Sequence, residues 1–201
     1  MADDLSDIRR SPLAGLDLGS RAGGAGGVLL SEGAARESFI LRGQADDAAF
    51  ARAVEAALGI GLPQEPAAAV GSDALLIRLG PDEWRLIVPL ADGGQFAARL
   101  ASELARAGGP GALVNVSSAT TVIAVAGERA TDLLATGTGI DFDPTAFPPG
   151  QSVRTRVGNT QALIHRQAVD AFELHVPRSH ARSFWEWLED RGREFHAAIA
   201  L

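Results

Sequence analysis

The sequence predicts an α+β protein made of two similar units, because one order of elements occurs twice along the chain. In both passages a short apolar strand and a glycine precede an Ala-rich or Leu-rich helix, a second glycine, a hairpin that ends in Val-Pro, and a polar helix. The matching landmarks are Gly43, Gly59 and Val88-Pro89 in the first passage and Gly127, Gly139 and Val176-Pro177 in the second. Two copies are too few for a solenoid, which needs about three or more repeats. We therefore expect a pseudo-symmetric pair of small α+β units.

The first unit follows from periodicity and turn signals. Phe50, Val54 and Leu58 recur every fourth residue, which is typical of the buried stripe of an amphipathic helix. A Gly-Pro-Asp-Glu turn between two apolar runs predicts a hairpin. The elements expected are a strand at 39–41, a helix at 46–58, hairpin strands at 74–79 and 84–88, and a helix through Phe96, Leu100 and Leu104.

The second unit opens with a run rich in β-branched residues, which favours a strand. The stretch 141–150 contains three prolines and is expected to be an irregular loop. The elements expected are a strand at 120–126, a helix at 128–135, strands at 153–157, 162–165 and 171–176, and a last helix at 178–198.

Composition shifts divide the chain into three segments. Residues 1–36 are expected to be a poorly ordered arm, residues 37–109 the first unit and residues 110–201 the second, with the Gly-Gly-Pro-Gly run at 108–111 as the boundary. The Gly-rich stretch 19–27 lacks the G-x-G-x-x-G spacing of a dinucleotide site, so a flexible linker is the simpler interpretation.

Composition also excludes several kinds of chemistry. The chain of 201 residues is 46% hydrophobic and 21% charged, which is ordinary for a globular protein, and its net charge of -7 argues against nucleic acid as a partner. It contains no Cys and no Lys, which rules out thiolate nucleophiles, thiolate metal sites, disulfides, Schiff bases and a P-loop lysine. No stretch approaches the about 18 apolar residues of a membrane span, and the acidic start is unlike a secretory signal, so we expect a cytoplasmic protein with no membrane contact.

Two pairs of charged residues are candidate sites. Asp141 and Asp143 could hold a cation or act in acid–base catalysis, although Asp before Pro is also an ordinary turn former. Arg154 and Arg156 lie two apart on a predicted strand, so they share a face and could grip a carboxylate or an acidic partner, or be solvated. The histidines are at positions 165, 175, 180 and 196, and no H-x-x-x-H pair suggests a helical metal site.

Motifs along most of the chain carry a resemblance to one family. They are Ser11-Pro12-Leu13, Gly59-Ile60-Gly61-Leu62-Pro63, Leu79-Gly80-Pro81-Asp82-Glu83-Trp84, the run from Asp141 to Gly150, Thr155-Arg156-Val157-Gly158, and Phe172 to Ser179 leading into Phe184-Trp185-Glu186-Trp187-Leu188. In this order and spacing the chain resembles the gamma subunit of heterotetrameric sarcosine oxidase. One departure is Asn115-Val116-Ser117, where many relatives would have an Asp.

The resemblance implies a fold of two pseudo-repeated ferredoxin-like units, similar to the folate-binding fold of the aminomethyltransferase T-protein. It implies alpha, beta and delta subunits as partners, in a complex that oxidatively demethylates sarcosine to glycine with hydrogen peroxide and methylenetetrahydrofolate. FAD, FMN, NAD and the tetrahydrofolate site are then expected in the larger subunits, and zinc in the delta subunit. This chain is expected to support assembly and not to catalyse, so we assign it no catalytic, cofactor-binding or metal-ligating residue.

Two tryptophans join the arginine pair as candidate partner contacts. On the last helix Phe184, Trp187 and Leu188 fall on one stripe, whereas Trp185 is about 200° from Trp187 and is expected to point elsewhere. Trp is enriched at interface hot spots, so Trp185 and, in the hairpin, Trp84 are candidates for a partner surface, with burial the alternative for each.

The enzyme alternative is a standalone folate-binding aminomethyltransferase-like protein. A partner subunit predicts an exposed apolar patch around the last helix or the hairpins, whereas an enzyme predicts a deep pocket with converging charged groups.

Overall fold

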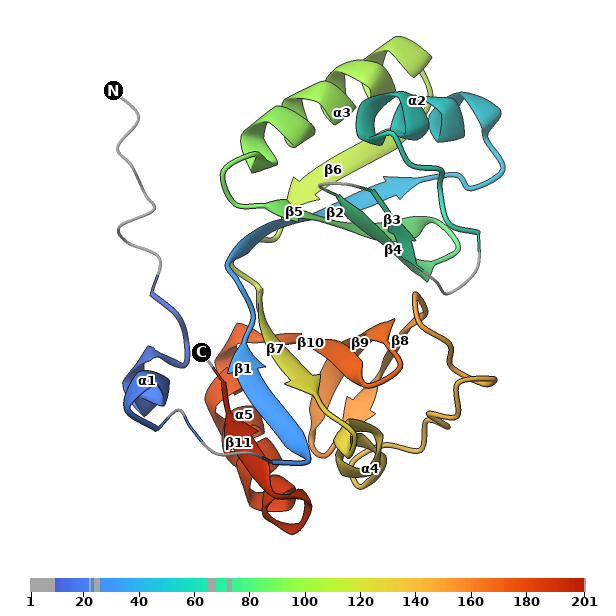
Figure 1. Ribbon diagram of the computed structural model, residues 1–201. Coiled ribbons are helices and arrows are strands. Elements are labelled where there is room, and N and C mark those ends of the chain that lie inside the picture. Colours follow the sequence, from blue (N-terminus) through green and yellow to red (C-terminus); the bar gives the residue numbers. More distant parts are fainter. Residues whose placement is uncertain (1–9, 22, 24–25, 65–67, 72–73, 201) are drawn as a thin grey trace.

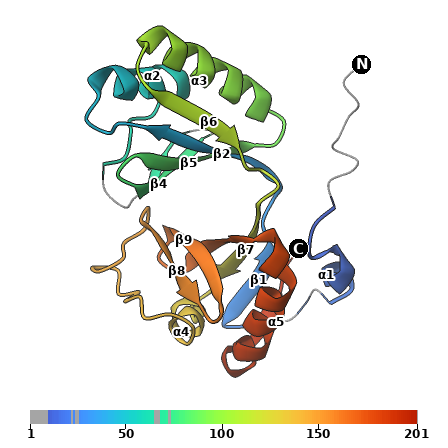
Figure 2. The same cartoon turned by 180° about the vertical axis from the view of Figure 1, so that it is seen from behind.

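The computed structural model describes residues 10–21, 23, 26–64, 68–71 and 74–200, and arranges them in four layers. Two β-sheets face each other in the middle, with helices on the outer face of each sheet (Figure 1). The view from behind shows the same order of layers (Figure 2). The α+β class expected from the sequence is confirmed. In the part of the chain that is described, no helix is long and apolar enough to cross a membrane.

The first sheet has five strands in the order β3-β4-β5-β2-β6, and every neighbouring pair is antiparallel. It is covered by the helices α2 (Ala48–Leu58) and α3 (Gly93–Ala107). Its strands are β2 (Arg36–Gly43), β3 (Ala68–Val70), β4 (Leu75–Gly80), β5 (Glu83–Pro89) and β6 (Gly111–Asn115). The hairpin expected around the Gly-Pro-Asp-Glu turn is the β4–β5 pair.

The second sheet has six strands in the order β11-β1-β7-β10-β9-β8. Only β1 and β11 pair in parallel, and the other neighbours are antiparallel. Its strands are β1 (Val28–Glu32), β7 (Thr120–Ala126), β8 (Ser152–Val157), β9 (Thr160–Ala168), β10 (Ala171–Pro177) and β11 (Ala197–Ile199). The helices α4 (Ala130–Ala135) and α5 (Ala181–Gly192) cover it, and short turns of helix lie at Ala14–Leu16, Leu18–Arg21, Arg178–His180 and Arg193–Phe195.

The predicted periodicity accounts for the core of the first unit. Asp47 caps α2, since its carboxylate accepts from the N–H groups of Ala49 and Phe50, and the buried stripe is the expected one. Gly59 ends the helix with φ 70°, a conformation that favours glycine. A second core lies between the other sheet and α4 and α5, and a small third cluster joins the two sheets.

Sheet membership corrects two boundaries expected from the sequence. Residues 28–32, placed in a poorly ordered arm, form β1 inside the second sheet. Residues 111–115, placed in the second unit, form β6 beside β2 in the first. After α3, the Gly-Pro break turns the chain back to the first sheet, where it forms β6. Pairing between residues far apart in the sequence decides which sheet a short strand joins. Both connections between the sheets, 33–35 and 116–119, therefore run side by side (Figure 1).

The last helix is shorter than expected. α5 ends at Gly192, a single turn follows, and His196 with φ 52° redirects the chain into β11. Residues 197 and 198 were expected to continue the helix, but together with residue 199 they form β11 and pair with β1, because the left-handed residue breaks the helical path. The strand at 120–126 and the irregular loop at 141–150 are confirmed.

Candidate functional site

The facing surfaces of the two sheets carry an unusual set of buried charged groups. Side chains alternate along β10, so Phe172, Leu174 and Val176 enter the helix-covered core while Glu173 and His175 face the first sheet. Around them a small apolar contact joins the sheets through Leu75, Ile77, Ile87 and Leu163. Charges are rarely buried unless they are paired, so this junction is the natural place to look for a site.

The charged groups form one network, which we call the inter-sheet cluster: Arg36, Arg85, His165, Glu173 and His175. The Arg36 guanidinium donates from Nη2 to Glu173 Oε1 at 2.9 Å and from Nη1 to Oε2 at 3.2 Å. His175 Nε2 lies 3.6 Å from Glu173 Oε2, which is ion-pair distance and too long for a hydrogen bond. Arg36 comes from the start of β2, and thus this pair fastens the connection between the sheets to β10.

Burial governs the protonation of the cluster. Loss of solvent lowers the pKa of both His165 and His175, although the nearby Glu173 carboxylate opposes this. Burial alone would raise the pKa of Glu173, but His175 and the Arg36 guanidinium outweigh burial and lower this pKa. Burial also lowers the pKa of Arg85, against the attraction of Glu83. The cluster therefore favours an ionised Glu173 beside two neutral imidazoles.

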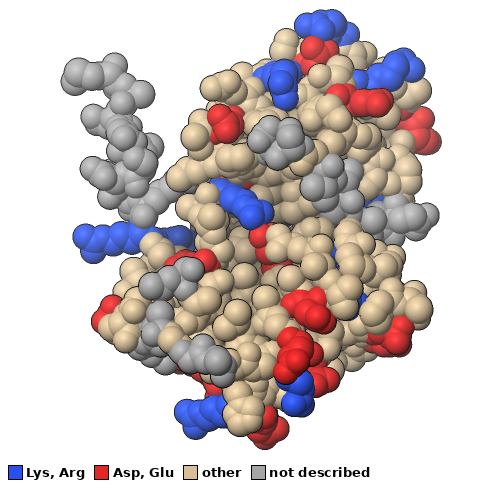
Figure 3. Space-filling view, viewed as in Figure 1, with Lys and Arg blue, Asp and Glu red and all other residues tan. Residues whose placement is uncertain are grey.

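A pocket of about 700 Å³ opens beside this cluster, where the two connections pass between the sheets. We call it the crossing pocket. Its polar lining includes Arg36, Ser38, Ser117, Thr121, His175 and Arg178. A second pocket of about 400 Å³ lies on the other side of Arg36, next to His165 and Arg166. Figure 3 shows basic and acidic atoms together at the level where the two sheets adjoin.

Both tryptophans offered as partner contacts are buried in this chain. Trp84 is 0% exposed and its Nε1 donates to the Pro63 carbonyl at 3.0 Å. Trp185 is also 0% exposed, which corrects the expectation that it points away from the core. The buried stripe of α5 is centred on Ala181, Phe184, Trp185 and Leu188. Neither indole is therefore a surface contact in this structure.

Trp187, which was expected to be central in that stripe, lies at its edge. It is half-buried, stacks on Phe184 with ring centroids 5.8 Å apart, and lies against Gly137 and Gly158. Glycines at these two positions leave room for the indole, and a Cβ on either would crowd it. The residue spacing therefore predicted a buried stripe of α5 that is rotated relative to the observed one, with Trp187 in place of Trp185.

The arginine pair is exposed. Arg154 and Arg156 lie on the edge strand β8, on the same face as Ser152, which is buried and bonded to His165. Their role as partner contacts remains a prediction.

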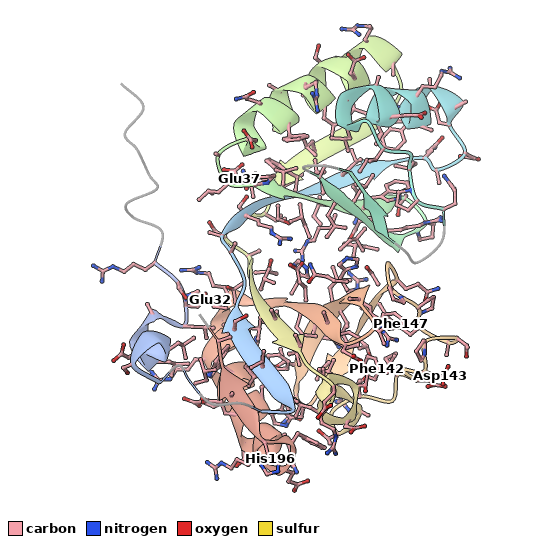
Figure 4. The ribbon with its side chains drawn as sticks, in the orientation of Figure 1. Glu32, Glu37, Phe142, Asp143, Phe147 and His196 are labelled. Carbon is pink, nitrogen blue, oxygen red and sulfur yellow. The ribbon has the colours of Figure 1, made fainter. Side chains whose placement is uncertain are left out.

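The paired aspartates organise a turn. Asp141 Oδ1 accepts from the Asp143 N–H at 2.9 Å, and Asp143 Oδ1 accepts from the N–H and hydroxyl of Thr145 at 2.8 and 2.6 Å. The Thr145 bonds lower the pKa of Asp143. Figure 4 shows Asp143 at the outer rim of the loop, with Phe142 and Phe147 turned toward the sheet. In the described ranges no group of three or more His, Asp or Glu is placed to hold a metal ion.

Sequence reasoning missed the members of the cluster other than the histidines. The alternation Phe-Glu-Leu-His-Val at 172–176 is a usable signal, since it puts Glu173 and His175 together on the face opposite three apolar side chains. It also missed Arg166, which is 1% exposed and donates to the carbonyls of Phe142 and Phe147. An irregular loop with buried carbonyls needs donors, and a nearby arginine is one source.

Comparison with known proteins gives the following matches. Residues 42–194 match the sarcosine oxidase, gamma subunit family. A sarcosine oxidase subunit gamma of Corynebacterium sp. (strain P-1) is 30% identical over 193 residues, which cover 94% of this chain and 93% of that protein. A chain in the structure of heterotetrameric sarcosine oxidase from Corynebacterium sp. U-96, in complex with pyrrole 2-carboxylate, superposes with a TM-score of 0.83 at 26% identity, over 96% of this chain and 100% of that one.

The fold is also shared with a larger protein. The glycine cleavage system aminomethyltransferase T from Bartonella henselae superposes with a TM-score of 0.66 at 15% identity, over 96% of this chain and 59% of that one.

Proposed function

Because the chain belongs to the sarcosine oxidase gamma subunit family, we propose that it acts as the gamma subunit of a heterotetrameric sarcosine oxidase. The observation that carries this is the end-to-end match to one whole chain of such a complex. The proposed role is non-catalytic: the subunit supports assembly of the complex that oxidatively demethylates sarcosine.

The partners proposed from the family resemblance are alpha, beta and delta subunits. They would carry FAD, FMN, NAD, tetrahydrofolate and zinc, and the complex would be cytoplasmic. The proposed contact surface includes Arg154 and Arg156 on the edge strand β8, where two exposed guanidinium groups can meet a partner's carboxylates.

We propose further that the two units are ferredoxin-like pseudo-repeats. In support, β2-α2-β4-β5-α3-β6 gives the sheet order β4-β5-β2-β6, which is that of a β-α-β-β-α-β unit. The second unit places β9-β10-β7 in the same order, with β1 beside β7 and β11 beyond it. In this arrangement an N-terminal strand is inserted before the last strand of the second repeat.

Exposed apolar surface gives little guidance to the interface. Among the described residues the large exposed hydrophobic side chains are Leu29, Val114 and Val169, and none of them is on α5. The patch was expected around the last helix or the hairpins; among these three side chains only Val169 is in a hairpin turn, between β9 and β10. A polar or mixed contact surface fits these side chains better, and non-obligate interfaces are about as apolar as other protein surface.

The test is a tagged pull-down from the native host, read by gel and by visible spectrum. We expect larger chains to co-purify and the eluate to show flavin absorbance. A colourless single band that elutes as a stable monomer would contradict an obligate role in such a complex.

The alternative function is a standalone folate-binding, aminomethyltransferase-like protein. The crossing pocket favours it, since it is roomy and lined by charged groups. Titration of the isolated chain with tetrahydrofolate decides this: saturable binding by a monomer that recovers no partner would support the alternative over the subunit role.

A further inference from the structure

We propose that the crossing pocket binds a small organic carboxylate. This goes beyond the proposed subunit role and does not depend on it. The pocket is formed by both connections between the sheets, by residues 10–12 and by residues of β1, β2, β5, β7 and β10, so it belongs to neither unit alone. Its volume of about 700 Å³ is within the range of small-molecule sites.

Two buried polar atoms of the lining make no hydrogen bond to any of the described residues. Ser38 is 7% exposed and its hydroxyl makes no hydrogen bond to the described residues, although its backbone N–H donates to Ser117 Oγ at 3.0 Å. His175 is 4% exposed and its Nε2 likewise makes no hydrogen bond to the described residues, since Glu173 Oε2 is 3.6 Å away. Unpaired buried polar atoms are uncommon and destabilise a fold, so a ligand that pairs with both is favoured.

The lining also carries positive charge that the carboxylates of the described residues neutralise only in part. No carboxylate of the described residues pairs with Arg178, whose Nη2 donates instead to the Arg10 carbonyl. Arg36 is shared with Glu173. The acidic side chain of the lining, Glu32, already accepts from the hydroxyls of Ser11 and Thr121. An anion entering the pocket therefore meets guanidinium and hydroxyl donors.

A carboxylate suits these donors better than a phosphate. A guanidinium matches a carboxylate with two parallel hydrogen bonds, and a hydroxyl and an imidazole N–H can serve its remaining lone pairs. Phosphate sites usually add backbone N–H groups from a helix N-terminus or a Gly-rich nest. The described lining of the crossing pocket consists of strands, connections and Arg178 in a short 3-10 turn, and no α-helix contributes to it.

The test is calorimetric titration of the full chain, and of the complex purified with it, with acetate and succinate. Acetamide serves as the neutral counterpart of acetate, and inorganic phosphate as the competing anion. We expect saturable binding of at least one carboxylate, none of acetamide, and weaker binding of phosphate. The Ser38→Ala and Arg178→Gln variants should each weaken carboxylate binding about tenfold or more, which is the usual effect of losing a charge-assisted hydrogen bond.

The matched control is Arg191→Gln, an exposed arginine on α5 that does not line the pocket, and it should bind as the unaltered chain does. A second readout is the ring resonances of His175, which should shift on addition of acetate while those of the exposed His180 stay in place. The proposal is overturned if neither carboxylate binds, if acetamide or phosphate binds equally well, or if both pocket variants bind like the control.

Discussion

At the scale of single residues, the inter-sheet cluster links the stability of the fold to pH. His165 and His175 have lowered pKa values, so between their folded values and the ordinary value of about 6.5 the unfolded chain binds more protons than the folded one. Stability therefore falls as pH drops below about 6.5. Glu173, also with a lowered pKa, acts in the same direction at still lower pH, as its stabilising ionised form is lost.

The first prediction concerns this slope. Urea unfolding at a series of pH values between about 7.5 and 5 should show a falling free energy of unfolding, by at most about 1.4 kcal/mol per pH unit for each histidine. His175→Gln should make the dependence of the unfolding free energy on pH less steep, because it removes one of the two imidazoles. The charged groups that face position 175, which are Arg36, Arg85 and Glu173, are unchanged in this variant. The control is His180→Gln, which alters an exposed imidazole outside the cluster. A slope that is identical in both variants would contradict the assignment.

The second prediction concerns Arg166. Its guanidinium donates to the carbonyls of Phe142, Phe147 and Val169 and lies 5.2 Å from the centre of the Phe172 ring. Arg166→Gln removes most of these bonds and leaves buried carbonyls unpaired, so unfolding free energy should drop by about 3 kcal/mol or more. Denaturant unfolding measures the loss, and early proteolysis within 141–150 would locate it. A loss under about 1 kcal/mol would mean that the loop does not depend on this side chain.

At the scale of elements, the sequence predicted correctly those helices and strands whose formation depends on residues close together in the chain. The helix at 48–58, the two hairpins and the strand at 120–126 rest on periodicity, turn chemistry and β-branched residues, all within a few positions of one another. The positions of β1, β6 and β11 depend on partners far along the chain, which no local pattern reveals. For the same reason, the sequence identified the histidines as titratable residues, but only the fold shows that His165 and His175 lie near Arg36.

The third prediction tests the buried face of α5. Trp185→Ala should lower the free energy of unfolding by about 3–5 kcal/mol, since it removes a fully buried indole from the core. Trp185→Phe, which keeps most of the packing, should cost less and leave any complex intact. The neighbouring exposed Glu186→Ala is the control and should stay within about 0.5 kcal/mol. Loss of a partner without loss of stability in Trp185→Phe would restore the interface interpretation of this residue.

At the scale of the whole molecule, two sheets that face each other present their edge strands and the outer helices to partners. The edge strand β8 carries Arg154 and Arg156, and the edge strand β6 of the other sheet carries Val114, 53% exposed. Edge strands expose unpaired backbone groups as well as side chains. Assembly of the proposed oxidase is thus expected to depend on the edges and not on the tryptophans.

The fourth prediction follows for β8. The double variant Arg154→Glu, Arg156→Glu reverses charge on exposed side chains, so the isolated chain should unfold at nearly the same urea concentration as before. If these residues meet acidic groups of a partner, like-charge repulsion should reduce recovery of the larger, flavin-containing chains in a pull-down about tenfold or more. The matched control is Arg182→Glu, Arg191→Glu, which makes the same change of charge on exposed positions of α5. Equal recovery with both double variants would remove β8 from the interface, and equal loss would show that total charge, not position, governs assembly.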